Sequence, residues 1–325
     1  MLDDKTIGVV VPAYNEELLI DKTLTTMPDF VDTVIVVNDG SSDGTKQKVQ
    51  SLAEIDSRIV LVDHPVNLGL GQSLIDGYLK SRELNLSITA VMAGDAQMAP
   101  DDLAAVVAPI LNGKAEYAKG NRLLMADVAK QMPLHRLIGN SGLTFLTKFA
   151  TGYWHVMDPQ CGYTAISADA LAAIPIEQMT KGYGYNADIL NMLNIRNFAV
   201  SDVEVKPVYG DEQSKIKLSS YIPKVSWLLI RLFFRRLLHK YMVRDFNPLC
   251  LSYITGMALF LLGTIPFGIR LLYMYDKHAE FPQTTFLCLM FLTIASVQIL
   301  LSAVQYDMED NRHLCIHGRG YRSGR

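Results

Sequence analysis

The chain has 325 residues, of which 50% are hydrophobic, and a formal net charge of −3. This length allows one large domain with an appendage or two small domains, and the charge argues against a general nucleic-acid binder. No signal-peptide pattern precedes the first apolar segment, so we expect roughly the first 220 residues to stay in the cytoplasm. We expect reduced thiols rather than a disulfide framework, because no metal-ligand spacing relates Cys161, Cys250, Cys288 and Cys315.

Short apolar segments alternate with helical segments through the first hundred residues. Buried strands are predicted at residues 6–11, 33–37, 59–62 and 88–93, because these segments are apolar without a polar alternation. Strands that alternate with helices predict an α/β domain with a mainly parallel sheet. Ligands bind such sheets beyond the carboxyl ends of the strands. Polar residues follow each predicted strand in turn, namely Asn15 and Glu16, Asp39 and Gly40, Asn67 and Gly69, and Asp95 and Gln97.

The fourth predicted strand ends in the segment Gly94-Asp95-Ala96-Gln97. It delivers a carboxylate and an amide oxygen two residues apart, and hard cations prefer oxygen ligands of these kinds. The segment therefore predicts a metal site. A turn-forming aspartate that merely ends a strand is the alternative for Asp95 taken alone.

Further α/β elements are predicted beyond residue 100. A helix at 133–150 carries Arg136 and Asn140, and a helix at 186–194 carries Asp188. A polar loop at 209–217 contains Lys215 and Lys217, for which an ordinary solvated loop is the alternative reading. Additional strands are predicted at 116–119, 162–167 and 200–205.

The C-terminal third changes character. Residues 219–246 interleave basic and bulky apolar side chains at near-helical spacing, which predicts amphipathic helices in a membrane interface, with a soluble partner-binding helix as the alternative. Residues 248–275 and 281–306 are each long and apolar enough to cross the ~30 Å hydrocarbon core. Basic residues flank this pair on both sides, so the positive-inside rule predicts a hairpin with both ends in the cytoplasm.

Three strand-end motifs occur in a specific order. They are Val-Pro-Ala-Tyr-Asn-Glu-Glu at 11–17, Val-Asn-Asp-Gly-Ser-Ser-Asp-Gly-Thr at 37–45, and Gly-Asp-Ala-Gln at 94–97. Together they resemble the family 2 glycosyltransferases of the GT-A fold, and within that family the polyprenyl-phosphate glycosyltransferases, the dolichol-phosphate-mannose synthase group. The segments at 67–69, 119–122 and 158–163 extend the resemblance, which covers roughly residues 6–245.

The resemblance implies four parts. We expect a GT-A glycosyltransferase domain, Rossmann-like with a mainly parallel sheet, at residues 1–218. Amphipathic interface helices at 219–246, two transmembrane helices at 247–306 and a basic cytoplasmic tail at 307–325 would follow. Such a chain would be an integral protein of a prokaryotic plasma membrane, with membrane lipids as partners and a homo-oligomer contact through its transmembrane helices.

The activity implied is inverting transfer of a sugar from a UDP- or GDP-linked donor to a polyprenyl phosphate, undecaprenyl or dolichyl, at the cytoplasmic face. The cofactor implied is Mg²⁺ or Mn²⁺ held by Asp95 and Gln97, while the first acid of the family's motif falls on Ala93, a departure. The donor would be bound by Pro12, Tyr14, Glu16, Asp39 and Asp95, and the acceptor phosphate by Arg122, Arg136, Asn140 and Lys215; the catalytic set would be Asp95, Arg122, Arg136, Asp188, Lys215 and Lys217.

Two other functions stay open at this point. A glycosyltransferase of the same fold acting on a saccharide or another lipid is one, although the Gln-x-x-Arg-Trp motif usual in processive polymer synthases is absent. A non-catalytic nucleotide-binding membrane scaffold is the other, and the replacement of an acid by Ala93 is its sole support.

Overall fold

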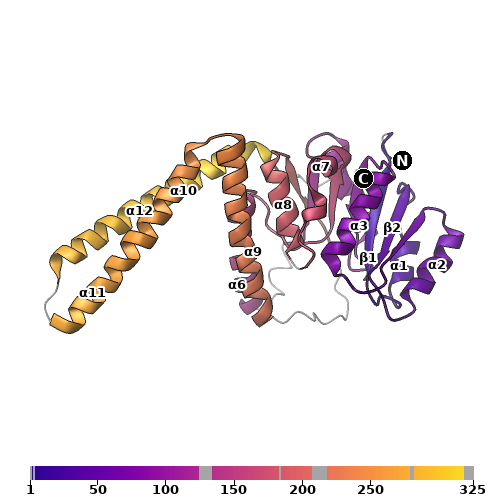
Figure 1. Ribbon diagram of the computed structural model, residues 1–325. Helices are drawn as coiled ribbons and strands as arrows, with labels where there is room; N and C mark the ends of the chain where they lie inside the picture. The colour runs from indigo at the N-terminus through magenta and orange to yellow at the C-terminus, as the bar shows by residue number, and fades with distance from the viewer. Residues whose placement is uncertain are drawn as a thin grey trace. The chain divides into compact units, whose positions relative to one another are not determined.

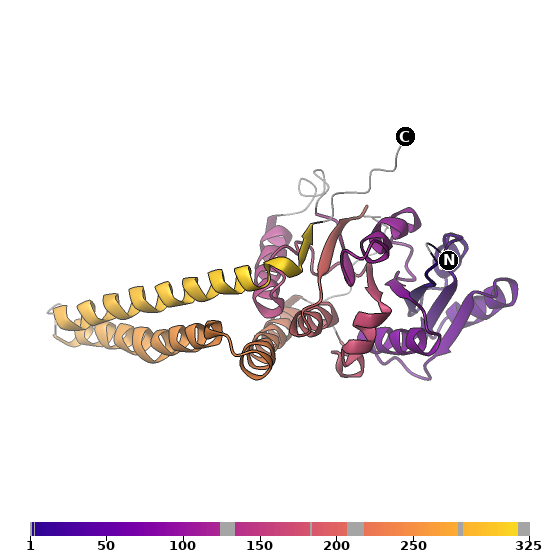
Figure 2. The same ribbon diagram turned by 90° about the horizontal axis from the view of Figure 1, so that it is seen from above.

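A computed structural model describes residues 2, 4–123, 134–182, 184–206, 218–278 and 282–317. The chain divides into two compact units (Figures 1 and 2). The first comprises Met1–Phe233 together with His313–Arg325, and the second comprises Phe234–Arg312.

The first unit is built on an eight-stranded sheet in the order β3-β2-β1-β4-β6-β5-β7-β8. β6 runs antiparallel to both of its neighbours, and every other neighbouring pair is parallel. The carboxyl ends of β1 to β5 and of β7, β6 excepted, therefore meet at one edge. The strands are β1 Ile7–Ala13, β2 Thr33–Asn38, β3 Ile59–Asp63, β4 Ile88–Val91, β5 Tyr117–Asn121, β6 Thr164–Ser167, β7 Val200–Glu204 and β8 Cys315–His317.

Helices cover both faces of this sheet (Figure 1). Val9 and Val11 of β1 belong to one core cluster and Val10 to the other, so successive side chains enter opposite layers. Burial on both faces explains why these strands read as continuous apolar runs. The first layer contains α1 Ile20–Thr25, α2 Thr45–Ile55 and α4 Leu103–Leu111, and the second contains α3 Leu70–Glu83, α7 Ala168–Ala173 and α8 Tyr185–Ile195.

A third cluster joins α8 to α6 (Leu134–Thr151) and to the first part of α9 (Leu218–Leu238). Asn191 of α8 donates from Nδ2 to the backbone oxygens of Ala150 and Leu232, at 2.7 and 2.8 Å. Trp227 on the opposite side of α9 is 70% exposed. α9 therefore has one packed face and one exposed face, on which Trp227 and Ile230 lie among the basic residues Lys224 and Arg231.

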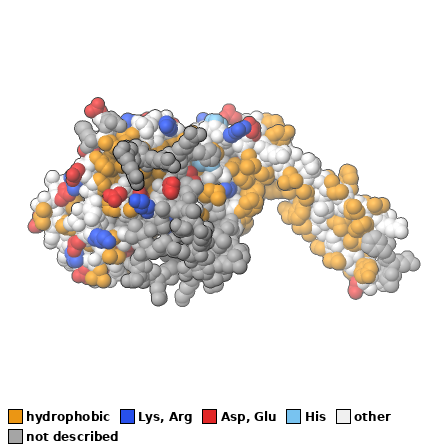
Figure 3. All heavy atoms as spheres, turned by 180° about the vertical axis from the view of Figure 1, so that it is seen from behind, with side chains coloured by type: hydrophobic (Ala, Val, Ile, Leu, Met, Phe, Trp, Pro, Cys, Tyr) orange, Lys and Arg blue, Asp and Glu red, His pale blue; other side chains and the backbone are white. Residues whose placement is uncertain are grey.

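The second unit is a helical hairpin. Its two long segments, Pro248–Lys277 and Gln283–Asp310, are long and apolar enough to cross a membrane. Large apolar side chains remain exposed along them, as Leu262, Leu272 and Phe291 illustrate at 79, 71 and 72% (Figure 3). The helices of this unit are η3 His239–Arg244, α10 Pro248–Ala258, η4 Leu259–Thr264, α11 Ile265–His278 and α12 Gln283–Asp310.

Together, the mainly parallel sheet of the first unit and the helical hairpin of the second confirm the predicted fold class.

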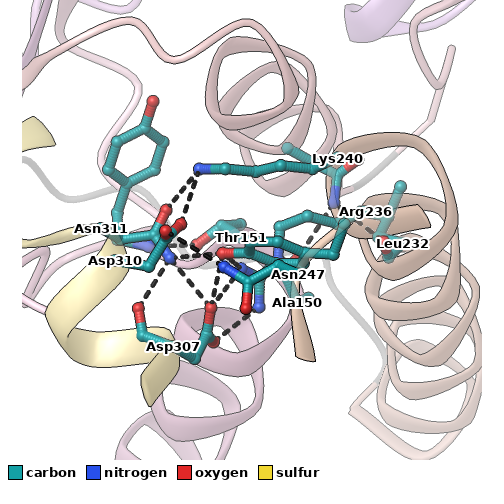
Figure 4. A network of polar contacts seen from close by, with 12 residues as sticks. Ala150, Thr151, Leu232, Arg236, Lys240, Asn247, Asp307, Asp310 and Asn311 are labelled. Atoms are coloured by element: carbon teal, nitrogen blue, oxygen red, sulfur yellow. Dashed lines mark hydrogen bonds and ion pairs between the residues drawn. The ribbon is translucent and has the colours of Figure 1, made fainter. Parts of the chain in front are cut away.

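A buried polar network lies at the base of this hairpin (Figure 4). Arg236 and Asp307 are 1% and 0% exposed, and two guanidinium nitrogens lie 2.7 and 2.8 Å from the two carboxylate oxygens. Tyr241 Oη lies 2.9 Å from Asp307 Oδ1, and Asn311 Nδ2 donates to the same oxygen at 2.8 Å. Lys240 donates to Asn311 Oδ1 at 2.7 Å, and burial lowers the pKa of this lysine to about 8.

The chain returns to the sheet after the hairpin. β8 pairs in parallel with β7, with Cys315 opposite Val200 and Ile316 opposite Ser201. This short strand was not predicted, because the segment was assigned to a basic cytoplasmic tail at 307–325. Residues 318–325 lie outside the described part of the chain.

Candidate active site

Asp39, one of the predicted donor-binding residues, follows β2 and is buried, at 3% exposure. Its backbone N–H donates to Ala13 O at the end of β1, at 2.9 Å. Oδ1 accepts from Leu68 N and lies 2.8 Å from His64 Nδ1, and Oδ2 accepts from Gly69 N, also at 2.8 Å. The carboxylate thus joins the end of β2 to the segment that leads from β3 to α3.

The other predicted donor residues lie after β1. Pro12 is buried within the strand, Tyr14 is 47% exposed, and Glu16 is half-buried. Glu16 N–H donates to Thr45 Oγ1 at 2.9 Å, which ties this segment to the start of α2. Hydrogen bonds therefore join the segments after β1 and β2 to each other at the carboxyl edge of the sheet.

Asp95 and Gln97 lie in a tight turn after β4. Asp95 Oδ1 accepts from Gln97 N at 3.0 Å, and Ala96 between them has φ of 54°. Gly94 N–H donates to Pro12 O at 3.2 Å, so this turn adjoins the end of β1.

This pair fits a divalent cation with few protein ligands. Within the described ranges there is no group of three His, Cys, Asp or Glu side chains that could hold a metal. Asp95 and Gln97 offer one carboxylate and one amide oxygen, and Mg²⁺ and similar ions commonly take their remaining ligands from water and substrate phosphates. Ala93 contributes no ligand, so the site has one acid fewer than the resemblance implies.

Arg122 follows β5 at the same edge. Its Nε and Nη2 donate to Asp158 Oδ2 and Oδ1 at 2.7 and 3.1 Å, a bidentate pair. The arginine side chain is 45% exposed and the aspartate side chain 7%. The aspartate therefore fixes a cationic group whose outer side faces solvent, as a phosphate-binding residue requires.

Asp188 has a clear local role. It is 1% exposed, and its Oδ2 accepts from Thr180 N and Thr180 Oγ1 at 2.8 and 2.6 Å. Lys181 O, next along the chain, accepts from Gly71 N at 2.9 Å. Asp188 thus braces the turn against the start of α3, and its predicted part in catalysis stays a prediction.

The remaining predicted residues have side chains outside the described part of the structure. Arg136 and Asn140 lie on α6, of which the backbone is described at these positions. Lys215 and Lys217 lie outside the described residues.

Two buried ionisable groups beside the site were missed by sequence reasoning. Lys119 is 0% exposed, and its Nζ donates to Cys161 O at 2.6 Å and to Asn186 Oδ1 at 3.0 Å. Burial lowers the pKa of Lys119 to about 8 and raises the pKa of Asp202 to about 6. The available signals were the position of Lys119 at the end of the predicted strand 116–119 and at the start of the segment 119–122.

His64 was also missed. It follows β3, is 8% exposed, and lies between the carboxylates of Asp39 and Asp76. The sequence shows it as an isolated histidine after a strand, since its partners are 25 and 12 residues away along the chain.

Known proteins resemble the chain in sequence and in fold. A UDP-N-acetylglucosamine–dolichyl-phosphate N-acetylglucosaminyltransferase of Methanococcus voltae is 32% identical over an aligned length of 221 residues, and the alignment covers 64% of this chain and 88% of that protein. A polyprenol monophosphomannose synthase of Mycolicibacterium smegmatis is 27% identical, over 61% of this chain and 75% of that protein.

A structural likeness supports the same fold. Glucosyl-3-phosphoglycerate synthase from Mycobacterium tuberculosis, solved with Mn²⁺, uridine diphosphate and phosphoglyceric acid, superposes with a TM-score of 0.53 at 21% identity, covering 72% of this chain and 78% of that one. Residues 8–174 match the family model described as glycosyl transferase family 2. The chain therefore belongs to glycosyl transferase family 2 and is a glycosyltransferase.

Proposed function

We propose that the enzyme transfers a sugar, with inversion, from a UDP- or GDP-linked donor to a polyprenyl phosphate. The observation that carries this proposal is that Asp39, Asp95 and Arg122 follow strands β2, β4 and β5, which run in the same direction and end at one edge of the sheet. The dolichyl and polyprenol phosphates named for the relatives support the acceptor class.

The chemistry needs charge neutralisation more than it needs a base. The sugar C1–O bond to the diphosphate breaks as a C1–O bond to the lipid phosphate forms, and a nucleoside diphosphate leaves. A phosphate monoester is already ionised near neutral pH, so no proton has to be removed from it. Direct displacement from the opposite face inverts the configuration at C1.

The protein's part is to hold two phosphate-bearing substrates together. Arg122, fixed by Asp158, would bind the acceptor phosphate. Asp95 and Gln97 would hold Mg²⁺ or Mn²⁺, which acts as a Lewis acid toward the leaving diphosphate. Asp39 would accept a hydrogen bond from the base of the donor.

The hairpin helices and α9 would bring the enzyme to a lipid acceptor. We place the hairpin of Pro248–Lys277 and Gln283–Asp310 in the membrane, with the glycosyltransferase domain and both chain ends in the cytoplasm, where nucleotide sugars occur. The exposed face of α9, which includes Trp227 and Ile230, would lie in the interface. This arrangement brings a membrane-bound phosphate to a soluble donor.

The test is a reconstituted reaction. The full chain is incubated with Mn²⁺, a panel of UDP- and GDP-sugars, and undecaprenyl or dolichyl phosphate, and the lipid extract is analysed by mass spectrometry. We expect an acid-labile phosphate-linked sugar, and at least a hundredfold loss of turnover in Asp95→Ala. Asp101→Asn, an exposed acid just after the same turn, is the matched control and should retain activity.

Other outcomes separate the alternatives. No turnover with any donor, or equal turnover by Asp95→Ala, would refute the proposal. A neutral, acid-stable glycolipid would indicate a different lipid acceptor. Metal-dependent hydrolysis of the donor without an acceptor would exclude the alternative that the chain is a non-catalytic scaffold.

A further inference from the structure

The imidazole of His64 is held between two carboxylates at the donor end of the site. Its Nδ1 lies 2.8 Å from Asp39 Oδ1, and its Nε2 lies 3.0 Å from Asp76 Oδ2. The contact of Nδ1 with Asp39 has hydrogen-bond geometry. The contact of Nε2 with Asp76 is close but does not have hydrogen-bond geometry. Because a carboxylate accepts and does not donate, Nδ1 carries the proton in the bond to Asp39.

A backbone hydrogen bond also fixes the position of His64. His64 N–H donates to Asn38 O at 2.9 Å, which extends the pairing of β2 with β3 by one residue. Asp76 lies on α3, and its Oδ2 accepts from Gln72 Nε2 at 2.9 Å. The ring is therefore clamped between the end of the sheet and the first turns of α3.

The segment after His64 wraps around Asp39. Gly69, which donates to Oδ2, has φ of +94°, and Gly40, next to Asp39, has φ of +65°. A Cβ on Gly40 would lie 2.4 Å from the carbonyl carbon of Val66, so the two segments touch through their backbones. This close wrapping lets two backbone N–H groups and one imidazole reach a single carboxylate.

The three donors leave the Asp39 carboxylate with one unused acceptor position. An ionised carboxylate has about four acceptor positions, two on each oxygen. Oδ1 uses two of them, for His64 and Leu68, and Oδ2 uses one, for Gly69. The remaining position is on Oδ2. Within the described ranges, His64 supplies the one side-chain donor that sets the rotation of this carboxylate.

We propose that His64 is a positioning residue for the nucleobase of the donor: it orients Asp39 so that Oδ2 accepts the ring N–H of the base. This inference rests on the proposed function, because it assumes a nucleotide donor at this end of the site. Uracil and guanine both carry a ring N–H, so the arrangement suits either base. Asp76 lies on the other side of the ring, 3.0 Å from Nε2, and makes no hydrogen bond to it.

Three variants separate the two ring nitrogens. In His64→Asn, the amide Nδ2 takes the place of the ring Nδ1 and can still donate to Asp39. In His64→Gln, the amide Nε2 takes the place of the ring Nε2, near Asp76, and the bond to Asp39 is lost. His64→Phe keeps the ring shape without either nitrogen.

The measurement is calorimetric binding of UDP and GDP to the full chain with Mn²⁺, without lipid acceptor, beside donor KM and kcat where turnover is seen. We expect His64→Gln and His64→Phe to weaken binding of the preferred nucleotide at least tenfold and raise donor KM to match, with kcat within threefold. His64→Asn should remain within threefold of wild type. Binding of inorganic diphosphate, which has no base, should be unchanged in all three.

Two results would overturn the inference. One is wild-type nucleotide affinity in His64→Gln or His64→Phe. The other is equal weakening of diphosphate binding, which would show that the substitution damages the whole site. Because binding is measured without acceptor, failure to form a lipid-linked sugar would refute the proposed function and leave this test standing.

Discussion

The buried pair of Arg236 and Asp307 gives a strong prediction about stability. Replacing Asp307 with Asn keeps the shape of the side chain and removes its charge. The guanidinium of Arg236, which is 1% exposed, would then be buried without the carboxylate that contacts it at 2.7 and 2.8 Å. Burial of an uncompensated charge is the main cost, because the surrounding helices leave it little access to water.

The expected magnitude follows from the burial of both partners. Removing one partner of a buried ion pair costs about 3–5 kcal/mol, which corresponds to a change of roughly 160- to 4800-fold in the unfolding equilibrium. Replacing both partners with apolar residues of similar size is often neutral or stabilising. The double variant Arg236→Met with Asp307→Leu should therefore be more stable than Asp307→Asn.

Thermal unfolding in detergent micelles, followed by circular dichroism, measures these differences. Glu309→Gln is the matched control, because this nearby acid is 75% exposed and lies 3.8 Å from Arg312. We expect the control to change stability by no more than about 0.5 kcal/mol. A wild-type melting curve for Asp307→Asn, or a double variant less stable than the single one, would contradict the reasoning.

Three further predictions concern the first unit. Gly71→Ala should destabilise the fold by about 1–3 kcal/mol in chemical denaturation, because the new Cβ would lie 2.3 Å from Thr180 O, whereas Gly142→Ala, with nothing within 4 Å, should not. Burial raises the pKa of Asp202 to about 6, so its stabilising contribution is complete below pH 3.8 and is lost as the pH rises through about 6. The melting temperature of Asp202→Asn should therefore rise relative to that of the wild type between about pH 4 and pH 7. A difference in melting temperature that stays constant over this range would count against the prediction. Asp158→Asn should lower kcat/KM for the lipid acceptor at least tenfold and leave donor KM unchanged, because it removes about 1.5–3 kcal/mol of charge-assisted hydrogen bonding that orients Arg122; equal effects on both substrates in steady-state kinetics would contradict it.

Much of the fold could be predicted because its physical causes are local. Strands such as Ile7–Ala13 are buried on both faces and so carry an uninterrupted apolar run. The hairpin segments are each long and apolar enough to cross a membrane. In both cases a short window of sequence contains the whole signal.

The parts that could not be predicted depend on pairing across the chain. His64 acquires its role when β3 pairs with β2 in the register that sets Asp63 opposite Asn38. The burial of the Lys119 side chain could not be predicted from its strand alone, because it arises where β5 lies inside the sheet between β6 and β7. Asp188 was expected beside the acceptor, and its burial and its bonds to Thr180 appear only with the fold.

The return of the chain to the sheet through β8 has a practical consequence. β8 covers the outer edge of β7, and an uncovered strand edge offers a template for pairing with other molecules. A fragment cut near residue 218 to remove the hairpin would lose Cys315–His317 and leave β7 as the outermost strand. A version of this enzyme without the hairpin is better made by replacing residues 234–312 with a linker, because that keeps the last strand in place.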